Sequence, residues 1–552
     1  MHSRATKWWG WGWEDHALPL ESRPVLWKYL QDRIKADPRT SCPVVPIEAI
    51  GVPPSLLSPT DLTELEALLG EENVSIENAM RITHAFGKGY KDLVRIRAGR
   101  VDRAPDAVVF PIDEDAVRRV LEFARRKRYA VIPFGGGTGV VGGVEPPAGA
   151  NATITVDLRR MQAIHGIDEE SGLVAAAAGI RGPQLEEALN AKGLTLGHFP
   201  QSWEFSTLGG WIATRAAGGM SNRYGKIDDL VVGVRLAAPT RTIDLRPLPG
   251  EAHGPDLKEL ILGSEGILGI VTQATLRAHP LPQTRSFASR LFHSFEEGLV
   301  ALRGMARDGS LPDMAYLSDE EETRFAAANA GIGPNGGTGF TGIGLKAVGL
   351  RGFSLRQGSL LLMGFEGSPG RVAHREKRAL DFAQPAANLG ASPARRWFEE
   401  RFETPYLRDS LLDHGILTDT VETAASWSNL RNVYLAGQKA LQESLWEAGT
   451  EGLVLCHVSH AYADGASLYF TFLGKQRPGA EIEQWEKVKG AVTGAFLGSG
   501  GALSHHHGIG ADHAPYLSRV IGEDGLVVLR ALKRELDPEG IMNPGKVLVG
   551  GV

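Results

Sequence analysis

A run of glycines directly behind an apolar segment constrains the fold of this chain more than any other feature. Residues 129–134 are predicted to form a short buried strand, and Gly135-Gly136-Gly137-Thr138-Gly139 follows it without a break. Glycine tolerates positive φ angles and close backbone contacts. Successive N–H groups in such a loop can curl around an anion, with the Thr138 hydroxyl as a further donor. The pattern predicts an anion-binding loop at the end of a strand, although a simple turn would look the same.

The glycine loop does not match the two common phosphate-binding motifs. A dinucleotide-binding fingerprint needs G-x-G-x-x-G at the start of a helix, whereas Val140-Val141-Gly142-Gly143 and then two prolines follow here. The Gly-Lys-Ser/Thr of a P-loop is also missing. We therefore expect a pyrophosphate cradle that belongs to another fold.

Strands and helices alternate around this loop. Further strands are predicted at 153–158, 173–176, 231–237 and 269–276, and helices run through 117–124, 182–192 and 522–535. Such alternation indicates an α+β or α/β domain. We expect four parts: a mainly helical N-terminal region over 1–100, a domain over 101–282 that contains the glycine loop, a long mixed segment over 283–495, and a C-terminal segment over 496–552.

Composition narrows the class of protein. The net charge of -6 argues against a general nucleic-acid binder. Two cysteines exclude a disulfide scaffold and a Cys-rich metal site, and they fit a reducing compartment. Neither a signal peptide nor an apolar stretch of about 18 residues is recognisable, so we expect a cytoplasmic protein. Residues 331–352 mix glycine with apolar side chains, and they are either a mobile loop or a surface that contacts a membrane.

Two local patterns have several interpretations. His505, His506 and His507 stand in a row, and they could form a proton-transfer site, a metal site or a solvated loop. His457 and His460 lie near Cys456 without a complete ligand set, so no metal site is expected. Near the other end of the chain, the Trp- and Gly-rich residues 8–13 are expected to form an arm packed on the body of the protein.

Two further segments have compositions that suit a cofactor. Residues 197–218 are rich in small and hydroxyl side chains, and residues 262–272 form a Gly-rich turn that enters a strand. Together with 133–139, they resemble the FAD-binding domain of the vanillyl-alcohol oxidase / p-cresol methylhydroxylase (PCMH) flavoprotein family. Residues 537–546 resemble the end of that family's FAD-linked oxidases. Residues 9–12, 200–211, 224–231 and 503–510 resemble the alkyldihydroxyacetonephosphate synthase branch, over nearly the whole chain.

The resemblance implies a fold, a cofactor and a reaction. The fold would be α+β, with a PCMH-type two-subdomain FAD-binding domain over 101–282 and an α+β substrate cap over 283–495. The enzyme would bind FAD noncovalently and exchange the acyl group of acyl-dihydroxyacetone phosphate for a fatty alcohol in ether-lipid synthesis, through an adduct at flavin N5. We expect a homodimer with a small-molecule or lipid substrate. The implied FAD contacts are Pro133, Phe134, Gly135, Gly136, Gly137, Thr138, Gly139, Gln201, Ser202, Trp203, Glu204, Phe205, Ser206, Thr207, Thr214, Arg215, Ala216, Ala217, Glu265, Gly266, Ile267, Leu268, Gly269, Ile270 and Val271.

The same resemblance implies roles for polar residues outside these segments. Arg408 is the candidate for binding the substrate phosphate, because a guanidinium fork matches phosphate geometry. Tyr469 is the acid–base candidate, and His198 with the three consecutive histidines would complete the polar pocket.

Two positions depart from the synthase pattern. Tyr316 stands where the family has an essential arginine, and a phenol carries no permanent positive charge. Gln201 replaces an acidic residue. Either another arginine compensates, or the substrate or reaction has changed. An FAD-dependent oxidase or dehydrogenase of a hydroxy acid or alcohol is the main alternative, and a flavin-binding protein without catalysis is the third hypothesis.

Overall fold

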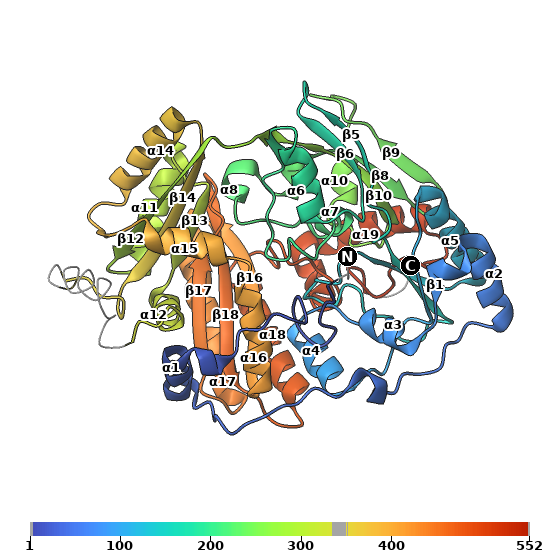
Figure 1. Ribbon diagram of the computed structural model, residues 1–552, viewed down its shortest axis with the longest axis horizontal. Helices are drawn as coiled ribbons and strands as arrows, with labels where there is room; N and C mark the ends of the chain where they lie inside the picture. The colour runs from blue at the N-terminus through green and yellow to red at the C-terminus, as the bar shows by residue number, and fades with distance from the viewer. Residues whose placement is uncertain (1–3, 334–348, 350–351, 550–552) are drawn as a thin grey trace. The chain divides into compact units, whose positions relative to one another are not determined.

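The computed structural model describes residues 4–333, 349 and 352–549, and its contacts divide the chain into two interleaved units (Figure 1). The glycine-loop unit comprises Val44–Gly218, Tyr224–Leu281 and His506–Val552. The large-sheet unit comprises Met1–Pro43, Gly219–Arg223 and Pro282–His505. Each unit combines segments that lie far apart in the sequence.

The glycine-loop unit contains two main sheets. In the first, β2 (Ala107–Val109) pairs antiparallel with β1 (Val74–Ser75) and parallel with β4 (Thr153–Asp157), which in turn runs parallel to β3 (Ala130–Phe134). The second sheet is antiparallel, with the order β5 (Ile164–Asp168), β6 (Leu173–Ala177), β10 (Ile270–Arg277), β8 (Val231–Ala237) and β9 (Thr242–Leu245). A two-residue pair joins β7 (Leu194–Thr195) and β11 (His279–Pro280). All five strands predicted in this region are therefore present.

Helices surround these sheets. They are α2 (Pro59–Leu69), α3 (Asn78–Thr83), α4 (Tyr90–Arg97), α5 (Glu114–Lys127), α6 (Gly182–Asn190), α7 (Leu208–Thr214), α9 (Ile227–Leu230), α10 (Lys258–Ile261) and α19 (Ser518–Leu536). The short α8 (Ser221–Tyr224) lies at the boundary of the units. The helix predicted over 522–535 is observed as α19, which is interrupted at Gly522 (φ +72°).

Helix α5 illustrates why the predicted elements form. The Asp113 side chain caps its first turn by accepting the Ala116 N–H at 2.7 Å. The apolar side chains Val117 and Leu121 are buried in the same cluster as Val131 of β3. Helical spacing of these side chains thus predicted both the helix and its buried face, and the helix covers the strand that leads into the glycine loop.

The C-terminal segment completes the β3 edge of the first sheet. The Val131 N–H donates to the Ile541 carbonyl oxygen at 2.8 Å, and its carbonyl oxygen accepts the Asn543 N–H at 2.9 Å. Asp537 shapes the preceding turn by accepting the Ile541 N–H at 3.0 Å. The strand that ends in the glycine loop is therefore flanked by β4 on one side and by residues 541–543 on the other.

The large-sheet unit is built on one antiparallel sheet. Its strand order is β15 (Ala387–Gly390), β12 (Thr284–Phe292), β14 (Ser359–Gly367), β13 (Met314–Ser318), β17 (Leu453–Val458), β18 (Gly465–Lys475) and β16 (Ile416–Ser426). Its helices are α1 (Pro24–Ile34), α11 (Phe295–Asp308), α12 (Glu320–Asn329), α14 (Pro369–Phe382), α15 (Ser392–Glu400), α16 (Thr404–Asp413), α17 (Trp427–Glu447) and α18 (Glu481–Gly498). Helices α11, α14 and α15 contact β12 and β14, whereas α17 and α18 contact β16 (Figure 1).

Two expectations about membranes have different outcomes. Across the described residues, every helix is too short or too polar to cross a membrane. The segment 331–352, which we expected to be mobile or to face a membrane, lies almost entirely outside the described residues.

Candidate active site

The glycine loop after β3 has the geometry of an anion cradle. Gly137 adopts φ +63°, a conformation that favours glycine. A Cβ atom added at Gly136 would overlap the Phe205 carbonyl oxygen, and one at Gly135 would overlap the Thr207 hydroxyl. Within the described part of the chain, the N–H groups of residues 135–139 have no hydrogen-bond partner. The loop therefore presents a row of free donors and packs directly against 201–207.

Two further segments expected to bind FAD lie beside this cradle. A Cβ atom added at Gly266 would be 2.8 Å from Pro133 Cγ, so residues 265–271 touch the end of β3. The Glu265 N–H donates to the Ala213 carbonyl oxygen at 3.0 Å, which brings residues 214–217 to the same place. All four expected FAD segments thus converge within the glycine-loop unit.

Glu265 anchors the loop that follows the histidine run. Its carboxylate oxygens accept the N–H groups of Ile509 at 2.5 Å and Gly510 at 2.7 Å. Burial of the Glu265 carboxyl raises its pKa to about 7, against the opposing effect of those two donors. His506 and His507 lie in the same unit with their ring centroids 4.9 Å apart. Glu265 thus has a structural role that its motif did not predict.

Two other expected site residues of this unit are engaged by the protein. His198 is 1% exposed and packs edge-on against Trp211, with ring centroids 5.0 Å apart. The Arg215 guanidinium forms ion pairs with Asp228 and Glu259, each at 2.9 Å. His198 therefore lies beside the segment 201–207, whereas the guanidinium of Arg215 connects neighbouring loops.

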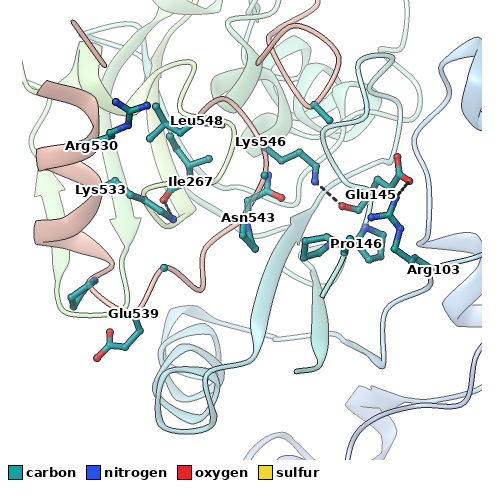
Figure 2. Close-up of a pocket in the computed structure, with 17 residues that line it drawn as sticks. Arg103, Glu145, Pro146, Ile267, Arg530, Lys533, Glu539, Asn543, Lys546 and Leu548 are labelled. Atoms are coloured by element: carbon teal, nitrogen blue, oxygen red, sulfur yellow. Dashed lines mark hydrogen bonds and ion pairs between the residues drawn. The ribbon is translucent and has the colours of Figure 1, made fainter. Parts of the chain in front are cut away.

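The glycine-loop unit also contains a pocket of about 570 Å³ (Figure 2). The C-terminal segment and α19 line it on one side, and residues 145–148 line it on another. Lys533 and Lys546 contribute ammonium groups to its wall. Among the residues expected to contact FAD, Ile267 alone lines this pocket, so most of the expected FAD site lies outside it.

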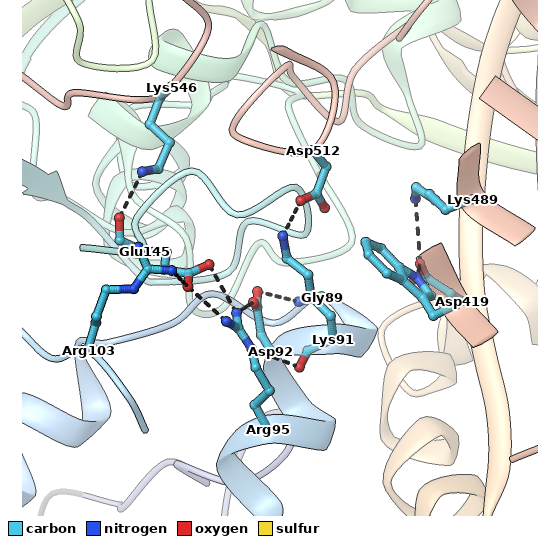
Figure 3. A network of polar contacts seen from close by, with 11 residues as sticks. Gly89, Lys91, Asp92, Arg95, Arg103, Glu145, Asp419, Lys489, Asp512 and Lys546 are labelled. Atoms are coloured by element: carbon cyan, nitrogen blue, oxygen red, sulfur yellow. Dashed lines mark hydrogen bonds and ion pairs between the residues drawn. The ribbon is translucent and has the colours of Figure 1, made fainter. Parts of the chain in front are cut away.

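A buried charge network supports the cradle, and sequence reasoning missed it (Figure 3). Arg95 in α4 forms an ion pair with Glu145 at 2.8 Å, and Lys91 in the same helix pairs with Asp512. Lys546 donates to the Glu145 carbonyl oxygen at 2.8 Å, and burial lowers the pKa of its ammonium to about 8. These partners come from four separate segments, so no local motif could have indicated them.

Two tyrosines and a histidine form a polar stack on the large sheet. Pairing of β13 with β17 and of β17 with β18 brings Tyr316, His457 and Tyr469 together. The His457 ring centroid lies 4.0 Å from that of Tyr316 and 4.8 Å from that of Tyr469, with nearly parallel planes. Burial raises the pKa of Tyr469 to about 12 and that of Tyr316 well above its usual value. Both phenols therefore keep their protons at neutral pH.

Glu322 in α12 connects two members of this stack. The Tyr316 hydroxyl donates to Glu322 Oε1 at 2.7 Å, and His457 Nδ1 lies 3.0 Å from the same oxygen. Among the described residues, no lysine or arginine pairs with Glu322. Position 316 thus contributes a phenol bound to a carboxylate and an imidazole. The sequence indicated His457 only as a rejected metal ligand, and it gave no signal for Glu322.

Arg408 and Tyr469 lie in one region of the large-sheet unit. Arg408 is carried by α16, which packs against β16, the strand paired with β18. The Arg408 guanidinium is close enough to Tyr469 to act on its pKa, in the direction opposite to burial. The structure thus brings together the candidate for phosphate binding and the candidate for acid–base chemistry.

The first of the three histidines is held by the large sheet. Glu422, which pairs with Tyr469 across β16 and β18, accepts the His505 N–H at 2.5 Å. His505 Nε2 shares a hydrogen bond with the Tyr462 hydroxyl at 2.6 Å, and its ring centroid lies 5.1 Å from that of His460. The unit boundary falls directly after His505, so the histidine run is divided between the two units.

Comparisons with known proteins agree with this arrangement. The model of the FAD binding domain family matches residues 105–243, and that of the C-terminal domain of FAD linked oxidases matches residues 281–547. An alkyldihydroxyacetonephosphate synthase of Dictyostelium discoideum is 36% identical over 512 residues, which cover 92% of this chain and 83% of that protein. The chain belongs to the alkyldihydroxyacetonephosphate synthase family. A solved alkyldihydroxyacetonephosphate synthase matches with a TM-score of 0.84 and 32% identity over 98% of both chains.

The fold and cofactor expected from the sequence are confirmed. p-Cresol methylhydroxylase, at 14% identity, matches 90% of this chain and 98% of its own with a TM-score of 0.67, which shows the shared PCMH-type fold. The protein is an FAD-dependent enzyme of the synthase family. The free N–H groups of the cradle fit a pyrophosphate, because an anion satisfies such donors. The oxidase alternative has less support, because synthases from three organisms match this chain at 32–36% identity.

Proposed function

We propose that this enzyme exchanges the acyl group of acyl-dihydroxyacetone phosphate for a fatty alcohol. The bond between C1 and the fatty-acid oxygen breaks, and the alcohol oxygen forms the new C1–O ether bond. The fatty acid leaves as a carboxylate, and the alcohol proton is released, so no net oxidant is needed. The observation that supports this function most directly is the packing of α16, which carries Arg408, on β16, the strand paired with the Tyr469 strand β18.

The proposed roles follow from the chemistry of each group. Arg408 binds the substrate phosphate through its guanidinium fork. Tyr469 exchanges a proton with the substrate at C1, and its high pKa makes its phenol a proton donor at neutral pH and its phenolate a strong base. His505, oriented by Glu422 and Tyr462, passes protons onward. His198, His506 and His507 complete the polar surroundings.

FAD, when bound, supplies an electron-accepting ring that activates C1 without a net redox change. We propose that residues 133–139, 201–207, 214–217 and 265–271 hold it. The cradle N–H groups bind the pyrophosphate, and the small residues of 201–207 and 214–217 allow the ring to lie close to the backbone. Glu265 keeps the loop after His507 in place beside this cofactor.

The test is an assay of the purified flavoprotein with palmitoyl-dihydroxyacetone phosphate and hexadecanol. We expect hexadecyl-dihydroxyacetone phosphate and free palmitate in equal amounts, with no net bleaching of the flavin under anaerobic conditions. Absence of the ether product with every acyl and alcohol chain length tried would contradict the proposal.

Tyr316 favours one other candidate function. Because a hydrogen-bonded phenol stands where the resemblance to the synthases implies an arginine, oxidation of a hydroxy acid or alcohol is the second hypothesis. In that reaction a histidine takes the hydroxyl proton while the flavin is reduced. Anaerobic mixing with glycolate, D-lactate or a long-chain alcohol distinguishes the two functions, since only oxidation bleaches the flavin without a second substrate.

We also propose a homodimer that works in the cytoplasm and contacts membranes through residues 331–352. Cys42 and Cys456 are not joined in a disulfide, which supports a reducing compartment. Sedimentation of the holoenzyme measures the oligomeric state, and cell fractionation measures the location. Flotation with phosphatidylcholine vesicles, compared with a variant in which residues 334–348 are replaced by a Gly-Ser linker, measures membrane contact.

A further inference from the structure

The N-terminal arm, residues 4–16, packs against helix α16 of the large-sheet unit. Lys7 Nζ forms an ion pair with Asp409 Oδ2 at 2.9 Å, and the two side chains are 5% and 11% exposed. The Trp11 N–H lies 3.1 Å from both Asp409 oxygens, and the Trp13 N–H donates to the Tyr406 hydroxyl at 3.1 Å. The arm is therefore held by buried polar contacts, which depend on geometry more than apolar contacts do.

Glycines allow this close approach. Gly12 has φ +74°, and a Cβ atom there would overlap the Tyr406 ring. A Cβ atom at Gly10 would lie 2.6 Å from Asp409 Oδ2. Lys7 Nζ also lies 5.1 Å from the centre of the Tyr406 ring. The alternation of tryptophan and glycine in residues 8–13 thus matches the surface of α16.

The arm contacts one face of α16, and Arg408 lies on another. Tyr406, Asp409 and Ser410 are spaced i, i+3 and i+4, so they share a face, and Ser410 Oγ accepts the Leu20 N–H at 3.0 Å. Leu407 and Leu411 belong to the apolar cluster of α1. Arg408 follows Leu407 by one residue, or about 100° around the helix. Contacts on two faces therefore fix the rotation of α16, and with it the direction of Arg408.

We infer that the arm is a positioning element for the substrate phosphate. Lys7 and the Trp11 backbone hold Asp409, and Asp409 sets the rotation of α16 that directs the Arg408 guanidinium. The arm itself does not touch substrate. This inference rests on the proposed role of Arg408, because a guanidinium fork binds phosphate well only when its orientation is fixed.

The test uses the full-length holoenzyme and the variant Lys7→Met, which leaves the buried Asp409 carboxylate without its cation. We expect KM for palmitoyl-dihydroxyacetone phosphate and Kd for the probe sn-glycerol 3-phosphate to rise about tenfold or more, with a smaller change in kcat. Lys7→Arg, which keeps the charge, should recover part of the affinity. The flavin absorbance spectrum should stay unchanged, because the arm and the FAD cradle belong to different units.

The matched control is Arg4→Ala in the same arm. This substitution removes the ion pair between Arg4 and Asp15. The Arg4 side chain is 48% exposed and that of Asp15 is 64% exposed, so the pair is solvent-screened and we expect no change in Kd. A double-mutant cycle with Arg408→Lys then separates a direct effect from general loosening. Losses of probe affinity that are not additive support action through Arg408, whereas additive losses overturn the inference.

The cycle also distinguishes the two proposals. If Arg408→Lys leaves probe binding unchanged, the proposed phosphate site fails, and the inference fails with it. If Arg408→Lys weakens binding but Lys7→Met leaves Kd within about twofold of the wild type, only the positioning role of the arm is overturned.

Discussion

At the scale of single residues, Tyr316 shows how one phenol connects a carboxylate and an imidazole in the large-sheet unit. The phenol binds Glu322 and lies parallel to His457, which in turn lies parallel to Tyr469. The Glu322 carboxylate accepts the Tyr316 hydroxyl at 2.7 Å and lies 3.0 Å from His457 Nδ1. The charged groups that act on the pKa of Tyr469 are Asp419, Glu422 and Arg408.

Tyr469→Phe tests the acid–base assignment. Removing the phenol hydroxyl should lower kcat by roughly 10²- to 10⁴-fold, the usual contribution of a general acid or base. The flavin spectrum and the thermal unfolding midpoint should change little, since Phe keeps the ring that stacks on His457. Tyr29→Phe is the control, because it removes a different phenol of the same unit, one that donates to Glu321. Full activity of Tyr469→Phe would exclude the assignment.

Glu265 makes stability depend on pH in a defined window. Its pKa is raised from the usual 4.5 to about 7, so the folded protein retains the proton at pH values where the unfolded chain has lost it. The associated stability is complete below pH 4.5 and is lost as pH rises through 7, by about 3 kcal/mol in all. Relative to Glu265→Gln, the free energy of unfolding of the wild-type apoprotein should fall by this amount between about pH 4.5 and 8. Parallel pH profiles of the two proteins would contradict the assignment.

At the scale of elements, the glycine loop must leave room for its close contact with residues 201–207 and must also present its N–H groups to an anion. A methyl group at Gly136 overlaps the Phe205 carbonyl oxygen, whereas one at Gly139 meets nothing within 4 Å. We expect Gly136→Ala to destabilise the apoprotein by about 1–3 kcal/mol and to weaken FAD binding, because the loop must move away from 201–207. Gly139→Ala, the matched control, should leave the apoprotein as stable as the wild type. Chemical unfolding and fluorimetric FAD titration measure both effects, and equal stability of the two variants would contradict the steric argument.

Elements with local signals could be predicted from the sequence, and assemblies of distant elements could not. Helical spacing through 117–124 predicts α5, and the apolar run before the glycines predicts β3. The Tyr316–His457–Tyr469 stack depends on pairing between β13 and β17, which lie far apart in sequence, and a shift of one residue in that register would turn His457 to the other face. Such register is set by packing of the whole sheet, so Glu322 and His457 could not be assigned.

At the scale of the whole molecule, each unit is assembled from segments that alternate along the chain. Residues 541–543 pair with β3, and Lys546 binds the Glu145 carbonyl oxygen. We expect truncation after Asp537 to abolish FAD binding, because it removes one flank of the strand that carries the cradle. Flavin content after purification measures this loss. Truncation after Leu548 is the control. If the variant truncated after Asp537 still contains flavin, the cradle forms without residues 541–543 and the expectation is wrong.

The pairing of residues 541–543 with β3 also bears on the order of events during protein synthesis. A ribosome makes β3 and the glycine loop early, but the strand gains its second neighbour only after residue 543 has been polymerised. Several hundred further residues, including most of the large-sheet unit, are therefore synthesised before residues 541–543 can pair with the strand that carries the loop. Cofactor uptake is then a late, post-translational event, and in cells short of flavin the finished chain would accumulate as apoprotein.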